Sequence, residues 1–392
     1  MTEVFLCASH RTPIGRYGGA LATLRPDDMA ALVIDGLLEL HPGLAVDEVI
    51  FGCANQAGED NRNVARMAVL LSGLPETVPA FTVNRLCASG LDAVIAGARA
   101  IRDGADVIIA GGVESMTRAP FVMAKGETAF ARQAQFYDTT IGWRFVNDKL
   151  AAAYGVDSMP ETAENVAIDH GISRLDQDAY ALRSQARYDA AWHSADIIPI
   201  TLRVGKGDTV IIRSDEHPRV TSLEKLSALP APFRAGGSVT AGNAAGINDG
   251  ASAMILASGA GVSRYGLVPI AQVGRAASAG VAPRVMGLGP IAALARLCGL
   301  TGLTLQDFDV IELNEAFAAQ VLACTRAWGL ADDAGHVNAY GGGIAMGHPL
   351  GMSGARIAAA AARRLFETGG KNGLATLCVG VGQGVALGLH SV

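Results

Sequence analysis

The hydrophobic pattern of the first 110 residues alternates between short apolar runs and longer amphipathic stretches. Four short runs predict buried strands at residues 4–8, 49–53, 81–84 and 107–110. Between the first two runs, acidic residues after Pro26 mark the start of a helix that runs through Leu40. A second helix is predicted over residues 63–71. This alternation predicts a mixed or parallel sheet with helices on its faces.

The same order of elements returns in the C-terminal third. Residues 269–273, 309–314 and 375–380 correspond to residues 4–8, 47–55 and 106–112. The third strand of each set follows a helix that opens with Ser-Gly, at Ser89-Gly90 and at Ser353-Gly354. We therefore predict a duplicated βαβ unit whose two halves pack about a pseudo-twofold axis, with a site at their interface.

A segment of different character, residues 117–246, separates the two halves. It holds two of the three tryptophans and several Gly- and Pro-rich loop signals, and residues 208–213 are predicted to form a hairpin strand. Long insertions in compact domains usually carry function. We expect residues 119–246 to cover the site and to provide oligomer contacts. Residues 1–118 with 247–267 would form the first half, and residues 268–392 the second.

Composition and charge exclude several classes of protein. The chain of 392 residues is 50% hydrophobic and 17% charged, with a net charge of −6 and no long basic run, which disfavours nucleic-acid binding. No apolar run is long enough to span a membrane. The six cysteines are widely spaced and form no CxxC pair, which disfavours a zinc ribbon, another metal site or a disulfide framework. A cytoplasmic location is expected, because neither a leader peptide nor a peroxisomal tripeptide is visible.

Cys87 is the first candidate for chemistry. It follows the apolar run 79–83 and precedes the apolar face of a predicted helix, so it lies at a helix start. The helix dipole and the free N–H groups there favour a thiolate, which is the nucleophilic form of cysteine. A buried structural thiol is the alternative, and is the more common role of a free cysteine.

Three later motifs favour the catalytic interpretation. Asn314 follows an apolar strand, where α/β sites form, although it could simply cap a helix. His348 lies in a glycine-rich stretch, residues 341–351, and suits a general base. Cys378 ends what we predict to be the last core strand. Gly380 follows it in a glycine-rich turn whose N–H groups could form an oxyanion hole, or which could be only a turn.

Together these motifs resemble the thiolase family of acyl-CoA acetyltransferases over essentially the whole chain. Residues 11–15 (RTPIG) and 111–116 (GGVESM) add to the likeness. Four stretches, residues 52–63, 138–145, 158–165 and 379–384, are most similar to β-ketoadipyl-CoA thiolases. The resemblance implies an α/β fold in which two βαβαβαββ halves form five layers, α-β-α-β-α, with an inserted loop domain.

The resemblance also implies roles for the motif residues. Cys87 would carry the acyl group as a thioester, and His348 would withdraw its proton. Cys378 would exchange a proton with the acetyl carbon. His348 and a water on Asn314 would form one oxyanion hole, and the N–H groups of Cys87 and Gly380 the other. The reaction would be thiolytic cleavage of a 3-oxoacyl-CoA, or the reverse Claisen condensation.

Coenzyme A is expected to enter as substrate, with no permanently bound cofactor, in a homodimer or homotetramer. The implied CoA contacts are Met159, Arg219, Phe233, Ala241, Ala245 and Phe317. The chain departs from the common family pattern at Ser158, Ala245, Tyr340 and Gly343, which leaves the acyl specificity and CoA contacts open. A substrate with two carboxylates would favour a cation near the acyl tail, and Arg144 and Arg132 are the candidates.

Two alternatives stay open from the sequence. Acetoacetyl-CoA thiolase, or a broad 3-ketoacyl-CoA thiolase, differs from the first interpretation in its acyl group. A non-catalytic CoA- or lipid-binding protein differs in class.

Overall fold

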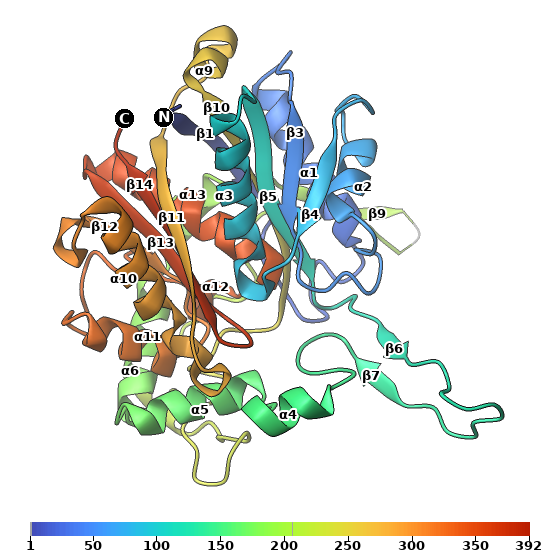
Figure 1. Cartoon of the computed structure of the whole chain (residues 1–392), viewed down its shortest axis with the longest axis vertical. Coiled ribbons are helices and arrows are strands. Elements are labelled where there is room, and N and C mark those ends of the chain that lie inside the picture. The colour runs from blue at the N-terminus through green and yellow to red at the C-terminus, as the bar shows by residue number, and fades with distance from the viewer. Residues whose placement is uncertain (1, 206) are drawn as a thin grey trace.

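A computed structural model describes residues 2–205 and 207–392 of the chain. Its centre is a ten-stranded sheet (Figure 1). Along the sheet the strands run β12 (Val310–Leu313), β13 (Asn372–Val379), β14 (Gln383–His390), β11 (Ala271–Gly280), β1 (Val4–Arg11), β10 (Asn248–Ser258), β5 (Val107–Ser115), β3 (Glu48–Gly52) and β4 (Ala80–Val83). The short β2 (Gly15–Arg16) pairs with β10.

The strand order confirms the predicted duplication. Counted outward from the sheet centre, β1, β10, β5 and β3 on one side match β11, β14, β13 and β12 on the other. The two halves meet where β1 and β11 pair at only two positions, Phe5 with Gln272 and Leu6 with Ala271. The matching pairs β3 with β5 and β12 with β13 are both parallel, and the first half adds a second parallel pair, β3 with β4.

Helices form three layers, one outside each half of the sheet and one between the two halves. With the two halves of the sheet counted as two layers, the predicted five-layered arrangement is confirmed. One apolar cluster joins α3 (Ser89–Arg102) and α13 (Leu350–Thr368) to strands of both halves, which places these helices in the middle layer. A second cluster packs α1 (Pro26–Leu40) and α2 (Val64–Leu71) on the first half. A third packs α10 (Gly289–Thr301) and α11 (Ala318–Ala327) on the second half.

The two middle helices cross at glycines, which explains the repeated Ser-Gly openings. A Cβ on Gly90 would lie 2.5 Å from the carbonyl oxygen of Gly351, and one on Gly354 would overlap the backbone of Leu91. Only a residue without a side chain permits this approach. The crossing draws the turn that holds Cys87 and the loop that holds His348 toward the same point.

The inserted segment extends over one end of the sheet. It contains the hairpin β6 (Phe121–Met123) and β7 (Phe136–Asp138), which projects from the body (Figure 1). Helices α4 (Asp148–Tyr154), α5 (Met159–Asp169), α6 (Arg174–Arg187), α7 (Ala190–Ser194) and α8 (Leu223–Ser227) follow. The hairpin predicted around residues 208–213 is present as β8 (Ile200–Val204) and β9 (Asp208–Ile212).

A buried ion pair fastens this segment to the first strand. The guanidinium of Arg11 binds the carboxylate of Asp215 at 2.6 Å, and both side chains are almost fully buried. Asp215 also accepts hydrogen bonds from the backbone N–H of Ile14 and from the hydroxyl of Tyr188. Removing one partner of such a pair leaves an uncompensated buried charge, so the contact fixes how the insertion sits on the sheet.

The short helix α12 (Gly343–Met346) and the 3-10 turn at Leu86–Ala88 complete the elements near the site, and the short helix α9 (Gly259–Tyr265) follows β10. Within residues 2–205 and 207–392, no helix combines the length and apolar character needed to cross a lipid bilayer.

Candidate active site

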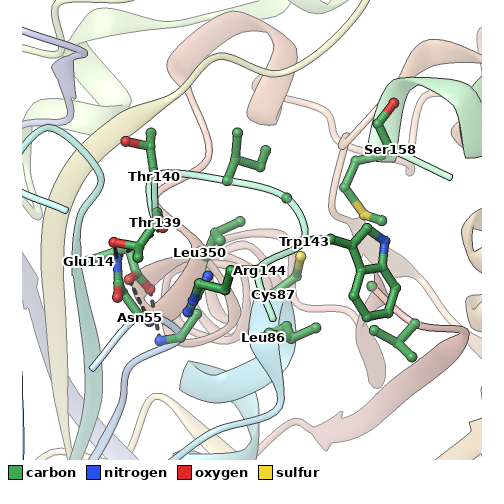
Figure 2. A pocket seen from close by; sticks show the side chains of 16 residues that line it. Asn55, Leu86, Cys87, Glu114, Thr139, Thr140, Trp143, Arg144, Ser158 and Leu350 are labelled. Carbon is green, nitrogen blue, oxygen red and sulfur yellow. Dashed lines mark hydrogen bonds between the residues drawn. The ribbon is translucent and has the colours of Figure 1, made fainter. Parts of the chain in front are cut away.

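Cys87 lies in a tight turn between β4 and α3, close to its predicted place at a helix start (Figure 2). Leu86, just before it, has a φ of +47°, a left-handed conformation that non-glycine residues rarely adopt. Two polar side chains hold the turn. Asn84 accepts a hydrogen bond from the N–H of Leu86, and the Ser89 hydroxyl accepts one from Arg85 and donates to the carbonyl of Leu86.

The predicted preference of Cys87 for the thiolate is wrong for the resting protein. Burial raises the pKa of the Cys87 thiol to about 11, and the nearby Glu114 carboxylate acts in the same direction. The backbone N–H groups of Gly380 and of Cys87 itself oppose this rise, because they stabilise the thiolate. The sequence reveals the helix start but not the apolar enclosure, which outweighs it. Cys87 is therefore a thiol that needs a base.

This raised pKa predicts how Cys87 reacts with iodoacetamide in the absence of substrate. Only the thiolate reacts, so the alkylation rate should rise about tenfold per pH unit from about pH 7 to about pH 10. Peptide mass spectrometry follows the Cys87 peptide, and Cys87→Ser gives the background from the other thiols. A plateau near the pKa of an ordinary thiol, about 8.5, would contradict the assignment.

Cys378 and Gly380 approach Cys87 from the second half of the sheet. Cys378 is buried near the end of β13, which corrects one detail of the prediction: β14 follows it and is the last core strand. Burial, followed by the nearby Cys87, raises the pKa of the Cys378 thiol well above its usual value. Gly380 lies in the turn between β13 and β14 and lines the same cavity as Cys87.

His348 is held by hydrogen bonds that define its tautomer. The Ser353 hydroxyl has a single proton, which it donates to the carbonyl oxygen of Pro349 at 2.8 Å. With its proton used in this way, the hydroxyl oxygen accepts a bond from His348 Nδ1–H, at 2.6 Å, and we assign that tautomer. The lone pair then lies on Nε2, which is 3.4 Å from the side-chain nitrogen of Asn314. Burial, with Arg356 nearby, lowers the pKa of His348 to about 3, so its imidazole is neutral.

The contact of Ser353 with His348 is not visible in the sequence, and the Ser353→Ala variant tests its role. Loss of the hydroxyl leaves His348 Nδ1–H without its acceptor and removes the preference for the reactive tautomer. An unsatisfied buried polar group costs roughly 1–3 kcal/mol, so kcat should fall about 10- to 100-fold. Ser263→Ala is the matched control, because Ser263 makes the same type of bond to Gly259 on an exposed helix. An unchanged kcat would show that Ser353 does not orient His348.

Asn314 follows β12 as predicted, but the helix after it, α11, begins only at Ala318. Its side chain therefore does not cap that helix. Asn314 Oδ1 is buried and accepts no hydrogen bond from any described residue. Asn248 was not predicted from the sequence, but it supports the loop that contains His348. Its side-chain oxygen accepts a hydrogen bond from the N–H of His348, and its side-chain nitrogen donates one to the carbonyl of Gly15.

The residues predicted to contact CoA fall into three groups. Met159 packs against an apolar cluster that contains Phe317 and Cys378, and it also lines the Cys87 cavity. Arg219 lines a separate cavity of about 400 Å³ beside α6 and donates to the carbonyl of Ala241. Ala245 N–H bonds the carbonyl of Ala316, next to Phe317. Phe233 is 41% exposed and is not among the described residues lining either cavity.

The Cys87 cavity has a volume of about 300 Å³ and mostly apolar walls. Glu114, which lines this cavity, lies with Cys53 and Asp60 in a buried group that could offer metal ligands. Glu114 already accepts hydrogen bonds from the N–H groups of Ala54, Asn55 and Gly351. We therefore assign Glu114 to bracing two chain segments, residues 54–55 and the start of α13, around the cavity.

Comparisons with family models and with curated proteins all point to the same family. The thiolase N-terminal domain matches residues 4–260 and the thiolase C-terminal domain residues 267–391. The β-ketoadipyl-CoA thiolase of Pseudomonas aeruginosa is 56% identical, with 100% of this chain and 99% of the relative covered. The 3-oxoadipyl-CoA/3-oxo-5,6-dehydrosuberyl-CoA thiolase of Escherichia coli is 57% identical, with both chains covered completely.

Solved structures agree with this family. The acetyl-CoA acetyltransferase of Bacillus anthracis superposes with a TM-score of 0.91 at 36% identity, covering 100% of this chain and 99% of the other. Human mitochondrial 3-ketoacyl-CoA thiolase in complex with CoA gives 0.90 at 37% identity, covering 100% and 98%. The chain belongs to the thiolase family. It is accordingly an acyltransferase, and the resemblance seen in its sequence is confirmed.

Proposed function

We propose that this thiolase cleaves 3-oxoadipyl-CoA with coenzyme A, releasing acetyl-CoA and a four-carbon acyl-CoA that ends in a carboxylate. The names of the two bacterial relatives support the substrate, since they match the chain from end to end. The observation behind the proposal is that two thiols and one backbone donor lie close together: Cys87, Cys378 and the Gly380 N–H. The reverse Claisen condensation would use the same groups.

In the first half-reaction His348 Nε2 takes the proton of the Cys87 thiol as sulfur attacks the C3 carbonyl. The bond between C2 and C3 then breaks, and its electron pair forms the enolate of acetyl-CoA. The Cys378 thiol gives its proton to C2, and acetyl-CoA leaves. The high pKa values of both thiols fit this scheme, because neither loses its proton before the substrate is in place.

In the second half-reaction the Cys378 thiolate takes the proton of the CoA thiol. The CoA sulfur attacks the thioester on Cys87, whose thiolate leaves and recovers its proton from His348. Developing oxyanions need hydrogen-bond donors, and the loss of one donor raises the activation free energy by roughly 3–4 kcal/mol. The N–H groups of Cys87 and Gly380 would serve one oxyanion. His348 and a water on Asn314 would serve the other, and the unused Asn314 Oδ1 supports that water.

A comparison of thiolysis rates tests the substrate. The purified protein is assayed with 3-oxoadipyl-CoA, acetoacetyl-CoA and a long-chain 3-ketoacyl-CoA under identical conditions. The proposal expects the highest kcat/KM for 3-oxoadipyl-CoA. A higher value for acetoacetyl-CoA would assign the chain to acetoacetyl-CoA thiolases, and the absence of turnover with all three would favour a non-catalytic CoA-binding protein.

We also propose that the chain forms homo-oligomers through the β6–β7 hairpin. Its loop and strands expose large apolar side chains: Phe121 (74% exposed), Met123 (54%), Phe130 (98%) and Phe136 (66%). Apolar surface gathered on a projecting hairpin is typical of an association site. Sedimentation velocity of the full chain measures the oligomeric state directly.

A further inference from the structure

One positively charged side chain lines the cavity beside Cys87, and the reaction scheme gives it no role. Among the described residues that line it, Arg144 is the single basic side chain and Glu114 the single acidic one. Figure 2 shows Arg144 between Cys87 and Asn55, on the segment that crosses over the cavity. The neighbouring walls are largely apolar and include Leu86, Ile141, Trp143, Met159 and Leu350.

Local structure holds Arg144 at this place. Its segment, residues 139–145, is fixed at one end because Thr139 accepts hydrogen bonds from the side chain of Asn55. At the other end, the rings of Tyr137 and Phe145 pack with centroids 4.7 Å apart. The indole N–H of Trp143 donates to the carbonyl of Asp157. The segment is thereby fastened on both sides of Arg144.

The guanidinium itself has no partner in the described part of the chain. Arg144 makes no hydrogen bond there, and none of the ion pairs formed by residues 2–205 and 207–392 includes it. Glu114 does not neutralise it, because three backbone N–H groups already use the oxygens of that carboxylate. Burial also raises the pKa of Glu114 to about 7. A half-buried guanidinium whose N–H groups are not used by the described residues has the geometry to bind a carboxylate in two parallel hydrogen bonds.

We infer that Arg144 binds the terminal carboxylate of the acyl group that Cys87 carries, and so selects 3-oxoacyl-CoA substrates that end in a carboxylate. This inference rests on the proposed function. Cleavage of 3-oxoadipyl-CoA leaves three C–C bonds of about 1.5 Å each between the thioester carbon and the carboxylate carbon, a reach of about 4 Å. That distance keeps the carboxylate inside the cavity that Cys87 and Arg144 share.

The same arrangement disfavours uncharged acyl groups. A chain that ends in a methyl group would cover the guanidinium without giving it a hydrogen-bond acceptor. Sites built to pair a polar group reject analogues that lack it, because the buried partner is left unsatisfied. Arg132, the other cation considered from the sequence, lies in the exposed β6–β7 loop and does not line the cavity.

Two substrates of equal length test the inference. 3-Oxoadipyl-CoA and 3-oxohexanoyl-CoA differ only in whether the chain ends in a carboxylate or a methyl group. Arg144→Gln should lower kcat/KM for 3-oxoadipyl-CoA about 10- to 100-fold, and leave that for 3-oxohexanoyl-CoA unchanged or raise it. Arg144→Lys should recover part of the loss, and Arg132→Gln, the matched control, should change neither value.

The outcomes separate the two proposals. An equal fall on both substrates, or no fall on 3-oxoadipyl-CoA, would overturn the role of Arg144. A wild-type protein that cleaves 3-oxohexanoyl-CoA faster than 3-oxoadipyl-CoA would overturn the proposed function itself. Activity of Arg144→Gln on the uncharged substrate shows that the variant is folded, so a selective loss cannot come from misfolding.

Discussion

Cys87→Ser should abolish thiolysis of 3-oxoadipyl-CoA, with kcat more than about 10⁴-fold below that of the wild type. A serine hydroxyl is far less acidic than a thiol, and the burial that raises the pKa of Cys87 to about 11 would act on the hydroxyl as well. His348, neutral and with a low pKa, is too weak a base to compensate. The acyl-enzyme should therefore not form.

The measurement is steady-state thiolysis, followed by the loss of the 3-oxoacyl-CoA. Serine is close to cysteine in size, so the variant should keep its thermal melting point. Cys298→Ser is the control, because Cys298 is a partly exposed cysteine on α10 and does not line the cavity. Residual activity within about tenfold of the wild type would show that another residue carries the acyl group.

Cys378→Ser should separate the two halves of the reaction. Cys87 keeps His348 and the Gly380 N–H in this variant. Because a CoA thiolate is a good leaving group without a proton from Cys378, Cys87 should still accept an acetyl group from acetyl-CoA. Carbon–carbon cleavage and condensation need a proton exchanged at C2, and they should fall about 10²- to 10⁴-fold. Mass spectrometry of the intact protein measures acylation, and the condensation of acetyl-CoA measures the second step.

The two readouts make this variant informative. Cys378 is buried in an apolar cluster with Phe317 and Met286, so serine also places a more polar atom there. Cys324→Ser, another buried cysteine outside the cavity, controls for that change. Loss of both acylation and condensation in Cys378→Ser would contradict the separate roles of the two thiols.

Much of the fold could be predicted from the sequence. Short apolar runs locate β1, β3 and β4 to within a few residues, because buried strands need continuous apolar side chains. The repeated Ser-Gly pairs at Ser89-Gly90 and Ser353-Gly354 indicated the duplication, and their meaning is physical: the glycines permit the helix crossing. β5 extends five residues beyond its predicted end at Ala110, since Gly111 and Gly112 carry no apolar signal.

The parts of the site that were missed depend on contacts between distant segments. The thiol state of Cys87 follows from enclosure by residues of both halves and of the insertion, which no local pattern reports. Ser353 was noticed for the repeat, yet its contact with His348 exists only because the loop turns at Pro349. The sequence left Arg144 and Arg132 equal, and only the folded insertion separates them.

The acyl-enzyme itself is the most direct test of this account. The wild-type protein is incubated with 3-oxoadipyl-CoA in the absence of free coenzyme A, quenched in acid and digested, and its peptides are analysed by mass spectrometry. We expect a succinyl group, the four-carbon acyl that ends in a carboxylate, on the peptide that contains Cys87. An unmodified Cys87, or a succinyl group on another residue, would contradict it.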